Sequence, residues 1–198
     1  MVGTNPDGPA ESELLQALAE AGAPAASVWN WVNGTTPAAA VPVLVDWLGR
    51  IGPEHARLRE GMVRALTTRA ARPVAAATVA AEMKRQAEYG ADWNTLWAYG
   101  NALAVLADDS AYDQVAALAA DRSLGRGREM LTAALAKMRS VGATEVLVGL
   151  LGDPEVDGHA VVALARRVDA PAEVLESYVD DPRPSVRRAA RRSQIKQA

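Results

Sequence analysis

The feature that most constrains the fold is a pattern that occurs twice in the last third of the chain. An apolar stretch ends at an Asp-Pro pair and a second apolar stretch follows at once, over residues 144–168 and again over 172–195. The pairs Asp153-Pro154 and Asp181-Pro182 are 28 residues apart (153 to 181). A recurrence at this period predicts helix pairs that cannot bury their apolar faces alone and therefore stack on one another.

The spacing within each unit predicts two helices separated by the Asp-Pro turn. Proline cannot continue a helix because it lacks an amide hydrogen, but it is well suited to the first turn of the next one. The aspartate before it can accept hydrogen bonds from free amides at a helix start. The inward positions recur three or four residues apart: Val146, Leu147, Leu150, Leu151, Ala160, Val161, Leu164 and Val168 in the first unit, and Val174, Leu175, Tyr178, Val179, Val186, Ala189, Ala190 and Ile195 in the second.

Apolar stretches at helical spacing, separated by polar turns, also fill the chain upstream. Ser12 and Asp92 are predicted helix caps, and Gly100 inside a helix predicts a tight crossing by a neighbouring helix. We expect about six antiparallel helix pairs in one domain, residues 11–198, after a flexible tail of residues 1–10. The upstream helices are predicted over residues 12–22, 25–33, 42–51, 54–69, 73–88, 93–107, 109–120 and about 128–138.

The segments LLGDPEVDGHAVVALARR (150–167) and YVDDPRPSVRRAARR (178–192) resemble HEAT repeats of the phycobilisome-lyase type in bacterial proteins. WAYGNALAVLADDS (97–110) and GRGREMLTAALAKM (125–138) are similar, and the resemblance continues upstream through residues 27–33, 42–48 and 59–66. It implies an all-α protein, a right-handed α-solenoid of the HEAT-like or ARM type. Proteins of this class mostly present binding surfaces. The resemblance therefore also implies a non-enzymatic scaffold or adaptor that binds a protein or peptide through its concave face.

Composition limits the compartment and the kinds of site. The chain has no cysteine, which excludes disulfides and thiolate metal sites and favours a cytoplasmic location. The first ten residues lack the basic start and apolar run of a secretory signal. The longest apolar stretch, 37–45, falls far short of the roughly 20 residues that cross a bilayer. We therefore expect no membrane partner.

The net charge of −3 is unevenly distributed. Residues 183–196 hold six basic side chains and no acid, which leaves −9 for residues 1–182. This basic helix is interpreted as the polar cap that ends a repeat array, and a nucleic-acid tail is the alternative. The acidic remainder argues against nucleic acid, because a groove that binds it must neutralise phosphates.

The binding candidates are the residues expected on the second helices of the pairs, which line the concave side of such solenoids, and in the turns beside them. They are Arg57, Arg64, Trp93, Trp97, Asn101, Arg126, Arg128, Glu129, His159 and Arg187. Their mixed charges and aromatic side chains favour a protein or peptide partner over a duplex.

Three of these positions have two interpretations each. Trp93 and Trp97 share a helix face, so they either anchor a partner or pack in the core in place of phenylalanine, which the chain lacks. Residues 125–129 open a helix and either hold an anion or place Arg128 in a salt bridge with a neighbouring repeat. His159 either faces a ligand groove or is a surface or capping histidine.

No catalytic residue, metal site or cofactor is predicted, because the two histidines, His55 and His159, are far apart in sequence and neither has a second ligand at metal spacing. Two further functions stay open. One is a HEAT-like enzyme or enzyme accessory, similar to a phycobilin lyase or to a DNA glycosylase. The Asp92-Trp93 pair is the only feature of the sequence that favours the glycosylase. The other is an inhibitor or immunity-type regulator, which sequence does not separate from an adaptor.

Overall fold

The computed structural model describes residues 7–32 and 34–197, and within them every regular element is a helix. The protein is all-α, as predicted. Its α-helices are α1 (Gly8–Glu20), α2 (Ala40–Arg50), α3 (Ala56–Leu66), α4 (Arg72–Glu88), α5 (Trp93–Leu106), α6 (Tyr112–Ala120), α7 (Glu129–Leu135), α8 (Gly142–Gly149), α9 (Asp157–Leu164), α10 (Ala172–Glu176) and α11 (Pro184–Gln197). Short 3-10 helices lie between them: η1 (Val28–Trp31), η2 (Pro53–His55), η3 (Arg69–Ala71), η4 (Asp109–Ala111), η5 (Arg122–Arg128) and η6 (Leu150–Gly152).

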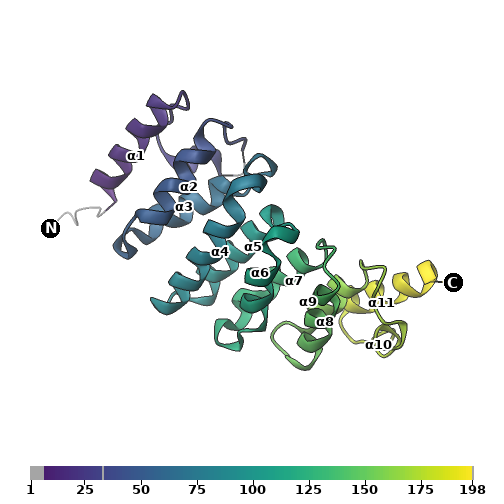
Figure 1. Cartoon of the computed structure of the whole chain (residues 1–198). Coiled ribbons are helices and arrows are strands. Elements are labelled where there is room, and N and C mark those ends of the chain that lie inside the picture. The colour runs from purple at the N-terminus through teal and green to yellow at the C-terminus, as the bar shows by residue number, and fades with distance from the viewer. Residues whose placement is uncertain (1–6, 33, 198) are drawn as a thin grey trace.

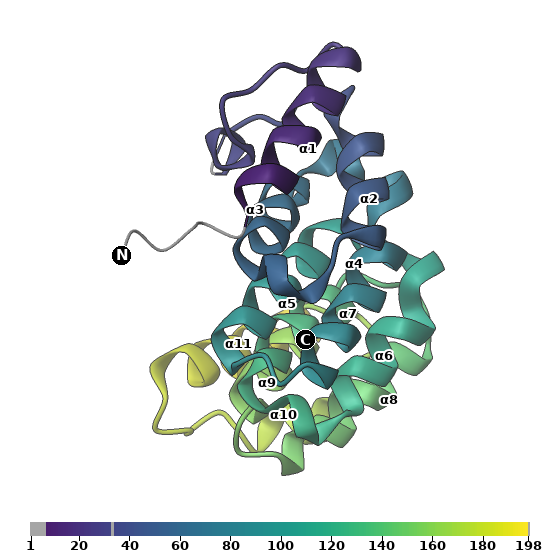
Figure 2. The same ribbon diagram turned by 90° about the vertical axis from the view of Figure 1, so that its left-hand side faces the viewer.

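The helices form two layers that follow the order of the chain. In the first layer, α2, α4, α6 and α8 each contact the next, and in the second layer α3, α5, α7, α9 and α11 do the same. Consecutive helices also pack across the layers, from α2 against α3 to α10 against α11. The chain advances from α1 at one end to α11 at the other, with its ends far apart (Figure 1). Figure 2 shows the two layers side by side.

The core between the layers is aliphatic and continuous, from Leu14 in α1 to Val186 in α11. Alanines such as Ala102 in α5 and Ala134 in α7 are fully buried, and small side chains of this kind permit close approach of helices. None of the five tryptophans is fully buried, and Trp93 is 48% exposed. The interpretation that tryptophan replaces phenylalanine in the core is therefore wrong for Trp93.

The predicted tight crossing at Gly100 is confirmed. A Cβ atom there would lie 3.0 Å from the carbonyl oxygen of Gly127 and 3.3 Å from the Cβ of Met130. A Cβ at Gly127 would lie only 2.6 Å from the Cβ of Leu96. The two glycines thus allow α5 and the chain entering α7 to touch backbone to backbone.

Some predicted helix ends are confirmed and others are wrong. Asp92 caps α5, since its Oδ1 accepts a hydrogen bond from the amide of Thr95 at 2.8 Å, and this bond lowers the pKa of Asp92. Ser12 is not a cap. It lies inside α1, where its hydroxyl donates to the carbonyl of Gly8 at 2.8 Å. Of the predicted tail, residues 1–6 lie outside the described residues, and Gly8–Ala10 belong to α1.

The Asp-Pro turns hold as predicted, but the helices begin later. Asp153 accepts the amide of Glu155 at 3.2 Å and Asp181 that of Arg183 at 2.8 Å. The prolines lie within these turns, because α9 begins only at Asp157 and α11 at Pro184. Val168, predicted to face inward, is completely exposed because α9 ends at Leu164.

No helix among the described residues combines the length and the apolar character that crossing a membrane requires.

Candidate functional site

Four of the predicted binding residues come together on the second layer, and we call them the Trp93 cluster: Trp93, Arg126, Glu129 and His159. The guanidinium of Arg126 lies over the Trp93 ring, 4.6 Å from its centre. Arg126 Nε also donates to Glu129 Oε1 at 2.8 Å, and Glu129 Oε2 lies 4.0 Å from His159 Nε2. Glu129 is buried while the other three side chains are exposed. The cluster is thus an exposed aromatic and cationic surface built on a buried carboxylate.

Local sequence explains how these elements place their side chains. The Asp92 cap fixes the start of α5, so Trp93 is its first residue. Gly125 in η5 has φ 50° and ψ −136°, a conformation that a side chain would strain, and it turns the chain toward α7. Gly127 then lies directly against Leu96. These two glycines bring Arg126 back over Trp93.

A shallow pocket of about 410 Å³ adjoins the cluster, where the first residues of α7, α9 and α11 approach one another. Arg126, Glu129 and His159 line one side of it, and Arg183 lines the other. Arg183 binds both carboxylate oxygens of Asp157, at 2.7 and 2.9 Å, and these hydrogen bonds hold the pKa of Asp157 below its ordinary value. Arg183 was not predicted as a site residue, because its partner lies 26 positions upstream.

Arg128 does not belong to this surface, and its prediction as a binding residue is wrong. Its side chain is fully buried, with Nε donating to the carbonyl of Gly125 at 2.9 Å and Nη2 to Asp153 Oδ2 at 2.8 Å. Of its two interpretations, the structure therefore supports the salt bridge, which joins Arg128 to Asp153, 25 positions further along the chain. Burial is the largest single influence and favours a raised pKa for Asp153, but the hydrogen bonds from Arg128 and the Glu155 amide, together with the charges of Arg128 and Arg122, lower the pKa overall.

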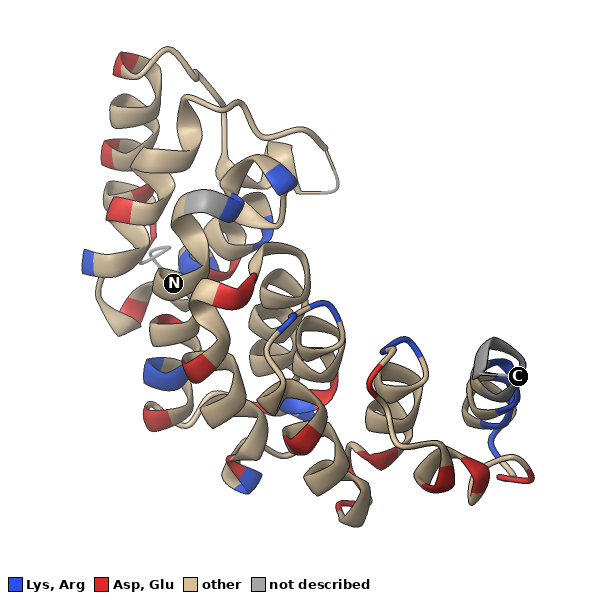
Figure 3. Cartoon of the chain, turned by 45° about the vertical axis from the view of Figure 1, so that its right-hand side comes forward, with Lys and Arg blue, Asp and Glu red and all other residues tan. Residues whose placement is uncertain are grey.

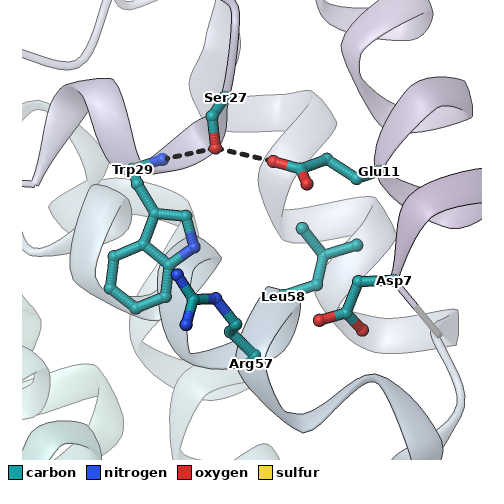
Figure 4. Close-up of a pocket in the computed structure, with 6 residues that line it drawn as sticks. All are labelled: Asp7, Glu11, Ser27, Trp29, Arg57 and Leu58. Atoms are coloured by element: carbon teal, nitrogen blue, oxygen red, sulfur yellow. Dashed lines mark hydrogen bonds between the residues drawn. The ribbon is translucent and has the colours of Figure 1, made fainter. Parts of the chain in front are cut away.

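A second pocket lies at the N-terminal end, between α1, η1 and α3 (Figure 4). Its volume is about 310 Å³, and Arg57 lies over the ring of Trp29, 5.4 Å from the centre. The hydroxyl of Ser27 donates to Glu11 Oε1 at 2.6 Å and accepts the amide of Trp29 at 3.4 Å. Arg57 was predicted as a site residue and Trp29 was not. The Ser27 capping box, which fixes the start of η1, was the sequence signal that could have pointed to Trp29.

Two other predicted residues meet in a smaller pocket of about 120 Å³. Arg64 and Asn101 line it together with Trp31, and Arg64 is held by Glu60 at 2.7 Å. Trp93, half-buried Trp97 and Asn101 recur every four residues on α5, so they follow one stripe of this helix. The stripe connects the Trp93 cluster to the Arg64 pocket near the end of α3, whereas the Arg57 pocket lies at the start of the same helix, against α1 and η1.

Arg187 lies apart from these pockets. It donates to the backbone carbonyls of Asp181 at 2.6 Å and Pro182 at 3.3 Å. Arg191 likewise donates to Val179 at 2.8 Å. The two arginines thus hold α11 to the preceding turn, which fits the cap interpretation. Basic residues gather on α11, whereas both signs are mixed over the rest of the chain (Figure 3).

Within the described residues, no three His, Asp or Glu side chains are arranged to hold a metal ion. Comparison of the chain with family models, with curated proteins and with solved structures finds no match.

Proposed function

We propose that the chain is a right-handed α-solenoid of HEAT-like repeats and serves as a non-enzymatic scaffold or adaptor. The order of contacts supports this architecture, because each second-layer helix touches the next from α3 to α11. Stacked pairs of this kind present an extended surface along one layer. The partner is a protein or peptide that lies along the second layer.

The Trp93 cluster is the observation that carries the proposal. Tryptophan and arginine dominate the binding energy of protein interfaces, above all where they sit in a pocket that a partner desolvates. Here an exposed tryptophan is stacked with an arginine beside a pocket, and the buried Glu129 holds that arginine in place. The stripe on α5 continues the surface through Trp97 to Asn101, so an extended peptide can contact more than one pocket.

The experiment compares two tryptophans that each carry a stacked arginine. Trp93 lies on α5 in the second layer, and Trp47 lies on α2 in the first, with Arg50 over its ring at 4.5 Å. A photo-crosslinking amino acid is placed at position 93 in one variant and at 47 in the other, and partners are identified by mass spectrometry. We expect a protein that crosslinks at position 93 and not at 47.

Charge reversal provides the matched control. Arg126→Glu and Arg50→Glu change the net charge equally, and each removes an arginine stacked on a tryptophan and paired with a carboxylate. We expect Arg126→Glu to abolish capture of that protein and Arg50→Glu to leave it unchanged. Equal capture by both variants contradicts the proposed surface. An effect of the bound chain on the partner's own activity would separate a regulator from a scaffold.

A further inference from the structure

Four cations gather at the end of α5 opposite Trp93, and we call them the basic cluster: Arg69, Arg72, Lys137 and Arg166. Two of them are fixed by hydrogen bonds to adjacent carbonyls of α5. Arg72 Nε donates to the carbonyl of Val105 at 2.8 Å, and Lys137 Nζ donates to that of Ala104. Residues from the start of α4 and the end of α7 are thus brought to the same point.

The packing of neighbouring elements brings the other two cations to this point. Arg69 begins η3, which contacts α5 and leads directly into Arg72. Arg166 precedes Arg167, whose Nη1 donates to the carbonyls of Leu135 at 3.0 Å and Met138 at 2.5 Å, on either side of Lys137. Burial lowers the pKa of Lys137, and the charges of Arg72, Arg166 and Arg69 lower it further, so the three arginines lie close enough to Lys137 to act on its charge.

The carboxylates of Asp108 and Asp109, which follow α5 in the chain, accept hydrogen bonds from other groups. Asp108 accepts both the hydroxyl and the amide of Ser110, at 2.6 and 3.0 Å, and these two bonds lower its pKa more than the charge of Arg72 does. Asp109 accepts the amides of Arg139 and Ser140. Among the described residues, no carboxylate pairs with any of the four cations, and the side chains of Arg69 and Arg166 make no hydrogen bond.

Stabilisation of the C-terminal end of α5 explains why two of the four cations are there, but not the other two. Cations near a helix C-terminus are stabilising because they complement the partial negative charge of its free carbonyls. Arg72 and Lys137 fill this role, since each donates to one of those carbonyls. Arg69 and Arg166 add two more positive charges that repel the first two, and among the described residues their side chains have no hydrogen-bond or salt-bridge partner. Such a cost is offset when an anion binds there.

We propose that the basic cluster binds an acidic segment of a protein, whose carboxylates take the free guanidinium groups of Arg69 and Arg166. Arginine suits this role because its planar group donates two parallel hydrogen bonds to one carboxylate. Nucleic acid fits less well, because residues 1–182 carry a net charge of −9 and four cations neutralise only a short run of phosphates. The site goes beyond the proposed function, since it uses none of the Trp93 cluster.

The test measures binding of a fluorescently labelled hexaglutamate peptide to the full chain by anisotropy, at low salt and at about 0.15 M ionic strength. The variant is Arg69→Gln with Arg166→Gln. The control is Arg188→Gln with Arg192→Gln, which removes the same charge from exposed positions on α11. We expect the first variant to weaken binding roughly fivefold to tenfold and the control less than about twofold.

Other outcomes overturn the proposal. Equal weakening in both variants means that only net charge matters, and an absence of binding to the unmodified chain removes the site. Tighter binding of single-stranded DNA of equal charge assigns the cluster to nucleic acid instead. Thermal unfolding of the first variant must match that of the unmodified chain, because the side chains of Arg69 and Arg166 make no hydrogen bond to any residue that the structure describes. Trp93→Ala must leave hexaglutamate binding unchanged, so failure here is distinguishable from failure of the proposed function.

Discussion

Two of the three tryptophan–arginine stacks in the described residues, Trp47 with Arg50 and Trp93 with Arg126, have nearly the same local geometry. On α2, Arg50 lies 4.5 Å from the Trp47 ring centre and 3.0 Å from Asp46. In the Trp93 cluster, Arg126 lies 4.6 Å from the ring and 2.8 Å from Glu129. The first stack comes from five consecutive residues of one helix. The second stack joins α5, η5 and α7, and it touches α9 through His159.

One stack therefore lies within a single helix, whereas the other is formed between several elements, and this difference decides how each depends on the packing of the helices. A stack within one helix forms wherever that helix forms, so it does not depend on how the neighbouring helices pack. A stack between elements exists only while consecutive layers keep their packing. The Trp93 cluster therefore depends on the residues that hold η5 against α5 and against the turn at Asp153. Substitutions at those residues should disturb this stack and not the one on α2.

Removing Arg128 should have the largest effect. Arg128→Ala takes away a fully buried cation and leaves Asp153, which is 5% exposed, without its main partner. Loss of one member of a buried ion pair costs about 3–5 kcal/mol of unfolding free energy. We expect urea unfolding to show this loss, and the fluorescence of Trp93 to change because η5 moves.

Arg122→Ala is the control for Arg128. Arg122 lies 3.7 Å from the same Asp153 oxygen but its side chain is 73% exposed, so its removal should cost less than about 1 kcal/mol. Similar losses for Arg122→Ala and Arg128→Ala would show that burial of the ion pair is not what holds η5.

A methyl group at Gly127 should have the next largest effect. The new Cβ would lie 2.6 Å from the Cβ of Leu96, which cannot swing away, so the backbone of η5 must shift. Overpacking of this kind costs about 1–3 kcal/mol, measured by urea unfolding. Gly149→Ala in α8 meets no atom within 4 Å and should be neutral or slightly stabilising. If Gly127→Ala has as little effect on the free energy of unfolding as Gly149→Ala, the close contact of η5 with α5 does not contribute to stability.

The sequence predicted those features that depend on short spacing. The helices, the Asp92 cap, the Asp-Pro turns and the crossing at Gly100 each follow from residues a few positions apart. The members of the Trp93 cluster were also named, because the repeat pattern placed them on second helices or in the turn before one. Their mutual contacts were not predicted, since they join residues 93, 126, 129 and 159, which lie on α5, η5, α7 and α9.

The errors have a common physical cause. Arg128 and Arg126 have the same residue type and lie two positions apart, yet one is buried and the other exposed. The left-handed turn at Gly125 decides between them, and sequence spacing alone does not give its direction. The basic cluster was missed for a similar reason, because its four cations are scattered between residues 69 and 166 and meet only at the end of α5.

Double-mutant cycles should show that the coupling energy between tryptophan and arginine is similar in the two stacks. An arginine over a tryptophan ring contributes about 0.5–1 kcal/mol at an exposed site. We expect coupling energies of this size both for Trp93 with Arg126 and for Trp47 with Arg50, from the unfolding of single and double alanine variants. The stacks would then differ in what they bind rather than in strength. A coupling near zero for Trp93 alone would mean that Arg126 is held by Glu129 and not by the ring.

Acid should have the smallest effect, and it should act on the side of the Trp93 cluster. The pKa of Asp157 is lowered by its hydrogen bonds to Arg183, so its folded-state pKa lies below the unfolded value of about 3.9. A group of this kind stabilises the fold above the unfolded pKa, and the contribution is lost as the pH falls through the folded one.

Because Arg183 is 43% exposed, the pair should contribute less than about 1 kcal/mol. Arg183 also binds Asp181, whose pKa it lowers in the same way. Arg183→Gln should therefore be slightly less stable than the unmodified chain in urea unfolding at pH 6, and the difference should shrink as the pH falls below about 3.9 and through the folded pKa values of the two carboxylates. A difference that does not shrink on acidification would assign the effect to packing of the Arg183 side chain against Gly158, not to its charge.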